Sequence, residues 1–436
     1  MKIILILLDG IGDRSYEILN HRTPLEAANT PNMNRLVAMG GNGLFHASSP
    51  GECLPSELAH FLLFGYDRKH FPGRGLLEAV GEGVSFDDSD VLCLSHFSKI
   101  RWETGIPILE KGRDDIPGSR EDLAKLYETV AFYETGGFCF RLQQTRRNDG
   151  IIVISPNVSP EASPNASPYI SDSDPITIGK HIGRIMTVAD NPEPEVAAKT
   201  VEALNKYLSY CHQHLTDDGR LSGIANFLVT QRCGRRIVQI PFSKLWGLDA
   251  MMIASGSVYG GLAHELGFDF VKVTDGSDPG RDLKERIQLA LDDTDHDFFH
   301  VHTKVPDETA HKQGPVQKKE AIERLDSAMA ELVDVLLTKK DIMVIVTGDH
   351  STPCGSSLIH SGETVPVVMA GQRVRRDQVK QFDEVSAAGG CLGLLRGREL
   401  MQMALNIADR SVLATHQLGD TVKTHVPDYY PPFELE

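Results

Sequence analysis

The first ten residues restrict the fold more than any other part of the chain. The run Lys2-Ile-Ile-Leu-Ile-Leu-Leu8 is almost wholly aliphatic and leads directly into Asp9 and Gly10. A strand that is apolar on both faces is typical of the centre of a parallel sheet covered by helices on both sides. Polar residues that follow such a strand lie at the carboxyl edge of the sheet, where open α/β folds form their ligand sites.

The same pattern occurs twice more in the second half of the chain. Residues 297–303 form an apolar run that leads toward Asp307, and residues 341–347 form another that leads into Gly348-Asp349-His350. Between these runs, apolar residues recur at three- and four-residue steps from Val316 to Lys339 and predict one amphipathic helix. Strands that alternate with helices predict an α/β fold with a doubly wound sheet.

The middle of the chain departs from this pattern. Residues 155–168 are rich in Ser and Pro, which favour neither a helix nor a sheet ladder, and they predict a surface loop. Helical patterning returns from Pro194 to His214. The expected division is a core of residues 1–95 and 240–436 with an inserted domain at residues 96–239.

Charge and composition argue against several classes of function. The 436 residues include 44 Lys and Arg against 60 Asp and Glu, and the formal net charge of −16 disfavours a nucleic-acid groove. The first apolar run is far shorter than the roughly 20 residues of a membrane span, so we expect neither a span nor secretion. The seven cysteines contain no Cys-x-x-Cys pair, which favours reduced thiols in the cytoplasm. The composition gives no guide to oligomeric state.

The polar residues near the strand ends have the composition of a metal site. Asp307 and His311 are four residues apart, so both side chains lie on one face of a helix and can reach one cation. Taken alone, that spacing is more often a surface ion pair. Asp9, the Asp349-His350 pair and His360 reverse that preference, because so many ionisable groups at one sheet edge are costly unless a cation neutralises them. Oxygen and imidazole ligands suit Zn, Mn or Fe better than Ca.

Ser56, in the segment Cys53-Leu-Pro-Ser-Glu-Leu-Ala-His60, precedes a probable helix. The usual role of a serine at such a position is to cap the helix. Close to cations, however, its hydroxyl can lose a proton and act as a nucleophile, and the helix dipole favours an incoming phosphate. Both interpretations remain open from the residues alone.

A set of motifs runs in order from the first strand almost to the C-terminus. They are Leu8-Asp-Gly10, Thr23-Pro-Leu-Glu-Ala-Ala-Asn-Thr-Pro31, Ser56-Glu-Leu-Ala-His60, Gly65-Tyr-Asp67, Gly73-Arg-Gly75, Glu78-Ala-Val-Gly81, Ser171-Asp-Ser-Asp-Pro175, Val305-Pro-Asp-Glu-Thr-Ala-His311, Gly348-Asp-His-Ser-Thr-Pro353, His360-Ser-Gly362 and Gly389-Gly-Cys-Leu-Gly393. In these motifs the chain resembles the archaeal-type cofactor-independent (2,3-bisphosphoglycerate-independent) phosphoglycerate mutases of the alkaline phosphatase superfamily. The resemblance implies an alkaline-phosphatase-like core with an inserted α/β cap domain that closes over the site.

The resemblance also implies two divalent metal ions, usually Mn or Zn, and a small phosphorylated substrate. By the family pattern, one ion is held by Asp307, His311 and His360, and the other by Asp9, Asp349, His350 and Ser56. Ser56 is then also the residue that becomes phosphorylated. A mutase would return the phosphoryl group to a different hydroxyl and so interconvert 3-phosphoglycerate and 2-phosphoglycerate.

The chain departs from the family pattern in the inserted domain. The family normally has an Asp-Arg-Arg-Ala-Gly-Arg motif and a later His-Arg pair that grip the substrate, whereas this chain has residues 110–116 and 148–152 there, with one arginine, Arg113. His96 stands where the family usually has Asn. Asn226 and Arg232 match the family's Ala-Asn…Arg-Gly pattern. The predicted substrate-binding residues are therefore Arg232, Asn226, His96 and Arg113.

Other arginines could replace the missing ones. The candidates are Arg101, Arg146 and Arg147, while Arg235 and Arg236 are equally consistent with an exposed basic surface.

Three hypotheses follow. The favoured one is a metal-dependent phosphoglycerate mutase that works through a phosphoserine at Ser56. The alternative is a phosphohydrolase, or a mutase of another phosphate or phosphonate ester, because the arginine-rich clamp is altered. The third is a metal-stabilised scaffold without activity, and an intact Ser56 counts against it.

Overall fold

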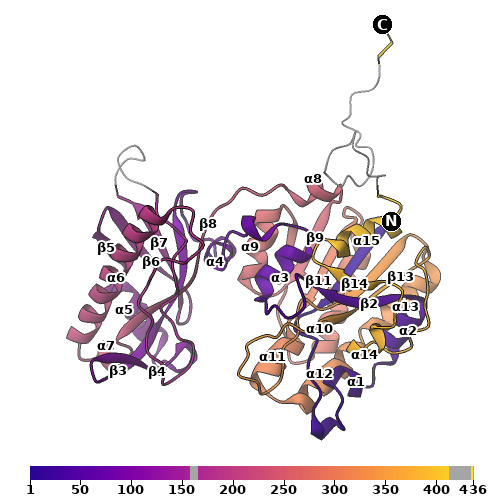
Figure 1. Ribbon diagram of the computed structural model, residues 1–436, viewed down its shortest axis with the longest axis horizontal. Coiled ribbons are helices and arrows are strands. Elements are labelled where there is room, and N and C mark those ends of the chain that lie inside the picture. The colour runs from indigo at the N-terminus through magenta and orange to yellow at the C-terminus, as the bar shows by residue number, and fades with distance from the viewer. Residues whose placement is uncertain (158–164, 412–433, 436) are drawn as a thin grey trace. The chain divides into compact units, whose positions relative to one another are not determined.

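The chain folds into two compact units, Met1–Phe71 with Gln239–Glu436 and Pro72–Val238. The computed structural model describes residues 1–157, 165–411 and 434–435 (Figure 1). Residues 72–95, expected in the core, lie in the smaller unit. The physical reason is that β3 (Val91–Glu103) is one continuous strand of that unit's sheet, and α4 (Arg74–Gly81) packs on it.

The larger unit is built on an eight-stranded mixed sheet. The strand order is β10-β9-β11-β1-β12-β13-β2-β14. The strands are β10 (Asp269–Lys272), β9 (Ala250–Ala254), β11 (Phe298–Thr303), β1 (Lys2–Leu8), β12 (Ile342–Thr347), β13 (Val365–Gly371), β2 (Gly40–His46) and β14 (Gly393–Arg396). The first five strands in this order are parallel, whereas β13 is antiparallel to both neighbours. The predicted central parallel strands are confirmed.

Strand register brings the three predicted polar segments to one edge of this sheet. Leu8 pairs with Thr303 on β11, and Leu7 pairs with Thr347 on β12. Asp9 therefore emerges beside the segments that follow both neighbouring strands. The side chains of β1 from Ile3 onward are fully buried, as a central strand requires.

Helices lie along the sheet of the larger unit (Figure 1). They are α1 (Pro24–Ala27), α2 (Pro31–Met39), α3 (Ser56–Leu63), α8 (Phe242–Trp246), α9 (Ser257–Leu266), α10 (Pro279–Asp292), α11 (Val305–Lys312), α12 (Pro315–Asp326), α13 (Met329–Thr338), α14 (Glu384–Ala387) and α15 (Glu399–Ile407), with 3₁₀ turns at Glu17–Leu19 and Arg68–His70.

The single helix predicted from Val316 to Lys339 is wrong, because the segment forms two helices, α12 and α13. At the break, the Ala328 N–H bonds the carbonyl of Leu325, three residues back instead of four. The Ser327 hydroxyl donates to the Arg324 carbonyl and takes up another acceptor of the last turn. Apolar spacing on both sides of the break remains compatible with one helix, which is why the pattern did not reveal it.

The smaller unit is an antiparallel sheet between helices. Its strand order is β4-β3-β7-β6-β5, with β8 also paired to β3. The elements not yet given are β4 (Ile106–Lys111), β5 (Phe132–Thr135), β6 (Phe138–Arg146), β7 (Asp149–Pro156), β8 (Phe227–Arg235), α5 (Arg120–Thr129), α6 (Pro194–Asp217), α7 (Leu221–Ile224) and a 3₁₀ turn at Arg113–Asp115. Alternate residues of β7 enter different apolar clusters, Ile152 with α5 and α6 and Ile151 with α4. The sheet is thus covered on both faces.

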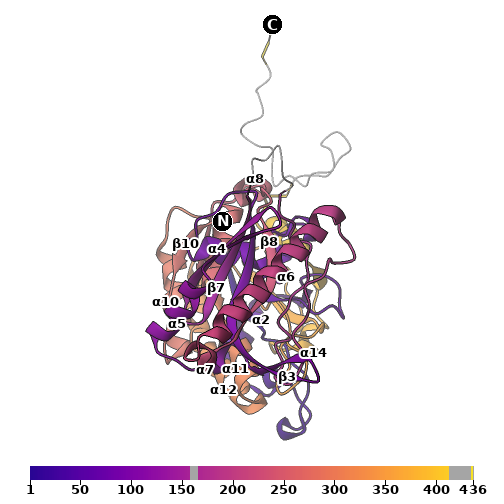
Figure 2. The ribbon, with the colours of Figure 1, turned by 90° about the vertical axis from the view of Figure 1, so that its left-hand side faces the viewer.

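Helix α6 confirms the helix predicted from Pro194 (Figure 2). Across the described ranges, no helix combines the length and apolar character needed to cross a membrane.

The loop predicted at 155–168 is partly wrong. Ser155 and Pro156 extend strand β7, which is paired with β6 there, and Ala166 and Ser167 are buried. The prediction for residues 158–164 lies outside the described residues.

The expectation that all cysteines are reduced is also wrong, because Cys93 and Cys233 form a disulfide. They lie on the neighbouring antiparallel strands β3 and β8, at a shift in register after Leu92. Their separation of 140 residues hides the pairing from any local motif. The cysteines therefore do not support the predicted reducing compartment.

Glu384 in α14 makes the stability of the larger unit depend on pH. Its carboxylate accepts hydrogen bonds from the Thr23 hydroxyl at 2.8 Å and the Asp13 N–H at 3.2 Å, and burial raises its pKa from 4.5 to about 7. The folded protein binds this proton more tightly than the unfolded chain. The stabilisation that Glu384 contributes to the folded state is therefore complete below pH 4.5 and is lost as the pH rises through about 7.

We expect Glu384→Gln to flatten the decline in the free energy of unfolding across that range, as measured by urea titration at several pH values. Glu399→Gln, which changes an exposed carboxylate of α15, is the matched control and should leave the decline unchanged. A Glu384→Gln profile that parallels the wild type would contradict the assignment.

Candidate metal centre

The predicted ligands gather at the carboxyl edge of the larger sheet. Four segments contribute: the turn after β1, helix α11 after β11, the turn after β12, and the loop before β13. They carry Asp9, Asp307 and His311, Asp349 and His350, and His360, respectively. Ser56 comes from the start of α3.

The first group is centred on Asp307. Its Oδ1 lies 3.2 Å from His311 Nε2 and 3.5 Å from His360 Nε2, and it accepts a hydrogen bond of 2.7 Å from the Thr352 hydroxyl. Burial alone would raise the pKa of Asp307, but the hydrogen bonds with His311 and His360 outweigh it and hold the pKa below its usual range. The α-helical spacing of Asp307 and His311 predicted from the sequence is confirmed, since both lie in α11.

The second group is centred on His350. Its Nε2 lies 3.4 Å from Asp9 Oδ1, 3.2 Å from Asp349 Oδ2 and 3.0 Å from Ser56 Oγ. The His350 ring also stacks on His360 with centroids 3.7 Å apart, which joins the two groups.

His350 takes part in both candidate ligand sets. Among the described residues, ligand atoms lie within 4.8 Å of one another in the set Asp307, His350 and His360 and in the set Asp9, Asp349 and His350. The family pattern assigns His350 to the second ion alone and places His311 with the first. In the structure His311 is instead the most exposed of these residues, and it contacts the group through Asp307.

Two buried oxygens show that these residues fit divalent cations. Asp9 Oδ1 and Asp349 Oδ2 are buried and have no hydrogen-bond donor among the described residues. A buried carboxylate oxygen without a donor is costly unless a cation neutralises it. Both oxygens face His350, so carboxylate and imidazole ligand atoms for a divalent cation come together here.

Burial and the neighbouring ionisable groups shift the pKa values of Asp349 and His350. Burial, followed by the neighbouring Asp9 carboxylate, raises the pKa of Asp349 well above its usual range. Burial and then the His360 ring lower the pKa of His350 to about 3, so this imidazole is neutral and free to act as a ligand. Cation binding is therefore expected to release a proton from Asp349.

Ser56 does not cap its helix. Pro55 occupies the N-cap position of α3, Ser56 is the first helical residue, and no side-chain capping hydrogen bond forms there. The N-cap interpretation is therefore wrong. The Ser56 hydroxyl instead lies against His350, at the positive end of the α3 dipole.

Gly10 allows the Asp9 turn to approach α11. Its φ is +64°, and an added Cβ would lie 2.5 Å from the Thr352 hydroxyl and 2.8 Å from Asp307 Cβ. The Asp9-Gly10 sequence thus combines a ligand with the residue that lets that ligand reach the group.

The sequence analysis missed Lys318, which is fully buried in α12. Its ammonium group donates to the carbonyls of Gly12 and Thr352, each at 2.9 Å, and lies 3.1 Å from Asp13 Oδ2. These contacts join the turn after β1 to the turn after β12, which hold Asp9 and Asp349. A lysine among the other charged residues of a helix gives no signal of such burial.

The predicted substrate-binding residues all belong to the smaller unit. His96 is buried on β3, with Nε2 3.3 Å from Asp174, and burial lowers its pKa to about 4 although Asp174 opposes the shift. The Asn226 amide accepts from the backbone N–H of Ile100 at 2.7 Å and donates to its carbonyl at 3.0 Å. Asn226 therefore joins the start of β8 to β3.

The two predicted arginines differ in environment. Arg113 lies 3.4 Å from Asp114 and 3.6 Å from Asp149, in a cluster that contains more acid than base. Arg232 is partly exposed on β8, and its backbone N–H donates to Asp172 at 2.6 Å.

The alternative arginines contact other groups of the protein. Arg101 pairs with Glu103, Arg146 with Glu78 and Glu82, Arg147 with the Ile116 carbonyl, Arg235 with Glu193 and Arg236 with Asp88. None of these contacts suggests a replacement for the family's clamp.

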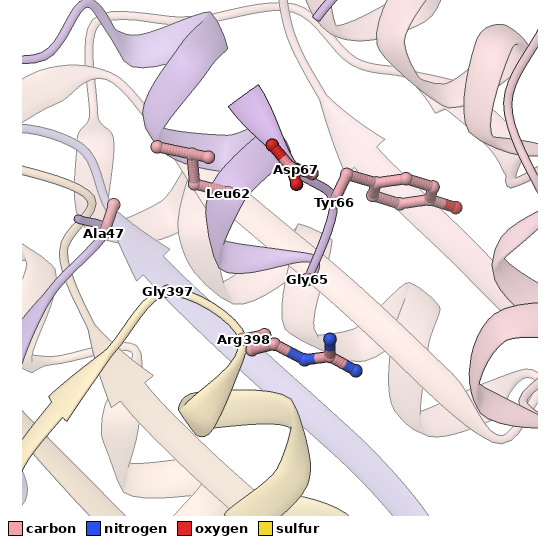
Figure 3. A pocket seen from close by; sticks show the side chains of 7 residues that line it. All are labelled: Ala47, Leu62, Gly65, Tyr66, Asp67, Gly397 and Arg398. Atoms are coloured by element: carbon pink, nitrogen blue, oxygen red, sulfur yellow. The ribbon is translucent and has the colours of Figure 1, made fainter. Parts of the chain in front are cut away.

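A hollow of about 210 Å³ in the larger unit does not coincide with the metal centre. Its lining residues are Ala47, Leu62, Gly65, Tyr66, Asp67, Gly397 and Arg398 (Figure 3). The candidate ligands are absent from this set, so we do not connect the hollow with the chemistry of the centre.

Known proteins resemble the chain over almost its full length. The family model of the Metalloenzyme superfamily matches residues 1–407. The chain is 37% identical to 2,3-bisphosphoglycerate-independent phosphoglycerate mutase 2 of Methanocaldococcus jannaschii, with 98% of each chain covered. It is 33% identical to the 2,3-bisphosphoglycerate-independent phosphoglycerate mutase of Thermoplasma volcanium, over 94% of this chain and 98% of that relative.

Two solved structures are also similar. A Pyrococcus horikoshii protein has a TM-score of 0.73 and 27% identity, over 95% of this chain and 99% of that chain. The cofactor-independent phosphoglycerate mutase of Thermoplasma acidophilum has a TM-score of 0.60 and 27% identity, over 94% of this chain and 100% of that chain.

Proposed function

Because the chain belongs to the Metalloenzyme superfamily, among the archaeal-type cofactor-independent phosphoglycerate mutases, we propose that it interconverts 3-phosphoglycerate and 2-phosphoglycerate without added bisphosphoglycerate. The observation that carries this proposal is the position of Ser56. Its Oγ lies 3.0 Å from His350 Nε2, beside two buried carboxylate oxygens that have no donor among the described residues. A nucleophile next to a cation site is the arrangement that phosphoryl transfer requires.

The proposed ligands of two divalent ions, Mn or Zn, are Asp9, Asp307, His311, Asp349, His350, His360 and Ser56. When bound, such ions supply charge stabilisation for the phosphoryl group. Ser56 Oγ gives up its proton and attacks phosphorus, the bond from phosphorus to the C3 oxygen breaks, and that oxygen takes up a proton, so that a phosphoserine and glycerate result. The C2 hydroxyl of the retained glycerate then attacks the phosphoserine and restores Ser56. Backbone N–H groups at the start of α3 favour the phosphate.

Arg232 is the proposed anion ligand from the smaller unit, since it matches the family's Ala-Asn…Arg-Gly pattern, whereas Arg113 lies among carboxylates. We expect Arg232→Gln to raise KM for 3-phosphoglycerate by about 10- to 100-fold, which corresponds to losing a charge-assisted hydrogen bond. Arg236→Gln, which changes a partly exposed arginine paired with Asp88, is the matched control. Steady-state kinetics that show equal KM values for both variants would contradict this role.

A second function is favoured by the composition of the expected clamp. Asn148 donates to the Arg113 carbonyl at 2.9 Å, so the two stretches that replace the family's arginine motifs lie together. They bring Arg113 next to Asp114 and Asp149, where the family carries several cationic groups. A dianionic carboxylate substrate would be held less well there. We therefore retain a phosphohydrolase, or a mutase of another phosphate or phosphonate ester, as the alternative.

Phosphorus NMR separates the two proposals. Mn-loaded protein is incubated with 3-phosphoglycerate and no bisphosphoglycerate, and the 2-phosphoglycerate and free phosphate signals are followed with time. The mutase proposal expects 2-phosphoglycerate without accumulation of phosphate. Phosphate as the sole product would favour the hydrolase, and no turnover would direct the search to other esters.

A further inference from the structure

The two aspartates of the second group share a pattern of hydrogen bonds. In each, one carboxylate oxygen accepts two hydrogen bonds and the other accepts none from the described residues. Asp349 Oδ1 accepts from the backbone N–H groups of Gly10, at 3.1 Å, and His350, at 3.0 Å. Asp9 Oδ2 accepts from the side chains of Tyr259, at 2.9 Å, and His302, at 3.1 Å. Only at Asp9 can the donors be changed by substitution.

The proton positions at Asp9 follow from the chemistry of the partners. The Tyr259 hydroxyl is the donor in its hydrogen bond with Asp9 Oδ2. Asp9 Oδ2 is the acceptor in both bonds, so His302 donates to it from Nε2. His302 Nδ1 has no hydrogen-bond partner among the described residues, so the bond to Asp9 is the one that fixes this ring.

We propose that Tyr259 and His302 are positioning residues that select Oδ1 of Asp9 as its metal-ligating oxygen. Two donors on Oδ2 fix the plane of the carboxylate and occupy the lone pairs of that oxygen. Oδ1 is left facing His350 Nε2 at 3.4 Å, in the second candidate ligand set. Hydrogen-bonded partners of this kind orient metal ligands, and losing them usually costs 10- to 100-fold in metal affinity. The inference rests on the metal centre of the proposed function.

The neighbouring strand position provides a matched control. His300 lies two residues before His302 on β11, both rings are fully buried, and their centroids are 5.7 Å apart. Neither nitrogen of His300 has a hydrogen-bond partner among the described residues. His300→Leu therefore tests the effect of replacing a buried imidazole on this strand without removing a bond to Asp9.

The experiment measures Mn²⁺ binding to the full-length chain by electron paramagnetic resonance titration. We expect Tyr259→Phe and His302→Leu each to weaken one of two Mn²⁺ sites by about 10-fold and to leave the other unchanged. His302→Gln, which keeps an N–H donor near the position of Nε2, should restore most of the affinity. His300→Leu should match the wild type, as should Tyr66→Phe, which removes a hydroxyl bonded to the Ile240 carbonyl at 2.8 Å.

Unchanged or tighter Mn²⁺ binding in Tyr259→Phe and His302→Leu would overturn the inference. Such a result would mean that the two hydrogen bonds only withdraw negative charge from Asp9, so that removing them does not weaken the site. Equal losses in His300→Leu and His302→Leu would also overturn it and indicate a packing effect. Circular dichroism melts identify any variant that fails to fold, and Tyr259→Phe is the mildest change. If wild-type protein binds no Mn²⁺ or Zn²⁺, the proposed function fails, whereas normal binding without mutase activity leaves this inference testable.

Discussion

Replacing Ser56 with alanine is expected to reduce the formation of 2-phosphoglycerate by about 10⁴-fold or more, because removing a nucleophile eliminates the covalent route. Ser56 Oγ lies beside His350 at the start of α3 and makes no capping bond, so the substitution removes little helix stability. An enolase-coupled assay of Mn-loaded protein measures the loss. Binding of Mn²⁺ to the group around Asp307 should persist.

The control for this substitution is Ser327→Ala, in the same unit. The Ser327 hydroxyl donates to the Arg324 carbonyl at 2.8 Å and has no part in the metal centre. Ser327→Ala should retain wild-type turnover. If Ser56→Ala also retained turnover within about 10-fold, transfer would not pass through this hydroxyl and the proposed mechanism would be wrong.

Replacing Lys318 with methionine is expected to lower the free energy of unfolding of the larger unit by about 3–5 kcal/mol, since it leaves the buried Asp13 carboxylate without its cation. The ammonium group also holds the carbonyls of Gly12 and Thr352. Urea unfolding followed by circular dichroism measures the change. Because the two joined turns carry Asp9 and Asp349, affinity for Mn²⁺ should fall as well.

Lys319→Met is the matched control for Lys318→Met. Lys319 is partly exposed and pairs with Glu323 one turn later, at 2.7 Å. A pair of this kind contributes about 0.5 kcal/mol or less. Comparable losses in the two variants would show that burial of Lys318 does not matter to stability.

The sequence predicted the fold class and the family because their signals are local and ordered. The strand before Asp9 is apolar on both faces, which is typical of the interior of a parallel sheet. The end of the first core segment at Phe71 and the break in the helix expected from Val316 could not be predicted in the same way. The boundary depends on the pairing of β3 with β8, whose partners lie far apart in the chain. The helix break leaves the apolar spacing unchanged, so the pattern does not show it.

For the candidate site, sequence patterns identified the ligand types but not their surroundings. Asp307 and His311 were found through helical spacing, and the structure brings His360 to them. Lys318 and Tyr259 were missed, because a lysine or tyrosine in a helix gives no sign that it faces a buried carboxylate. The pairing of Cys93 with Cys233 was missed for another reason, because its partners lie 140 residues apart and form no local motif.

The most direct test of the central claim is to locate the phosphoryl group on the protein during turnover. Mn-loaded protein is mixed with 3-phosphoglycerate labelled in its phosphate, quenched in acid, digested and mapped by mass spectrometry. The account predicts label on the peptide that contains Ser56, and none in Ser56→Ala. Label on another residue, or 2-phosphoglycerate formed without any labelled peptide, would contradict it.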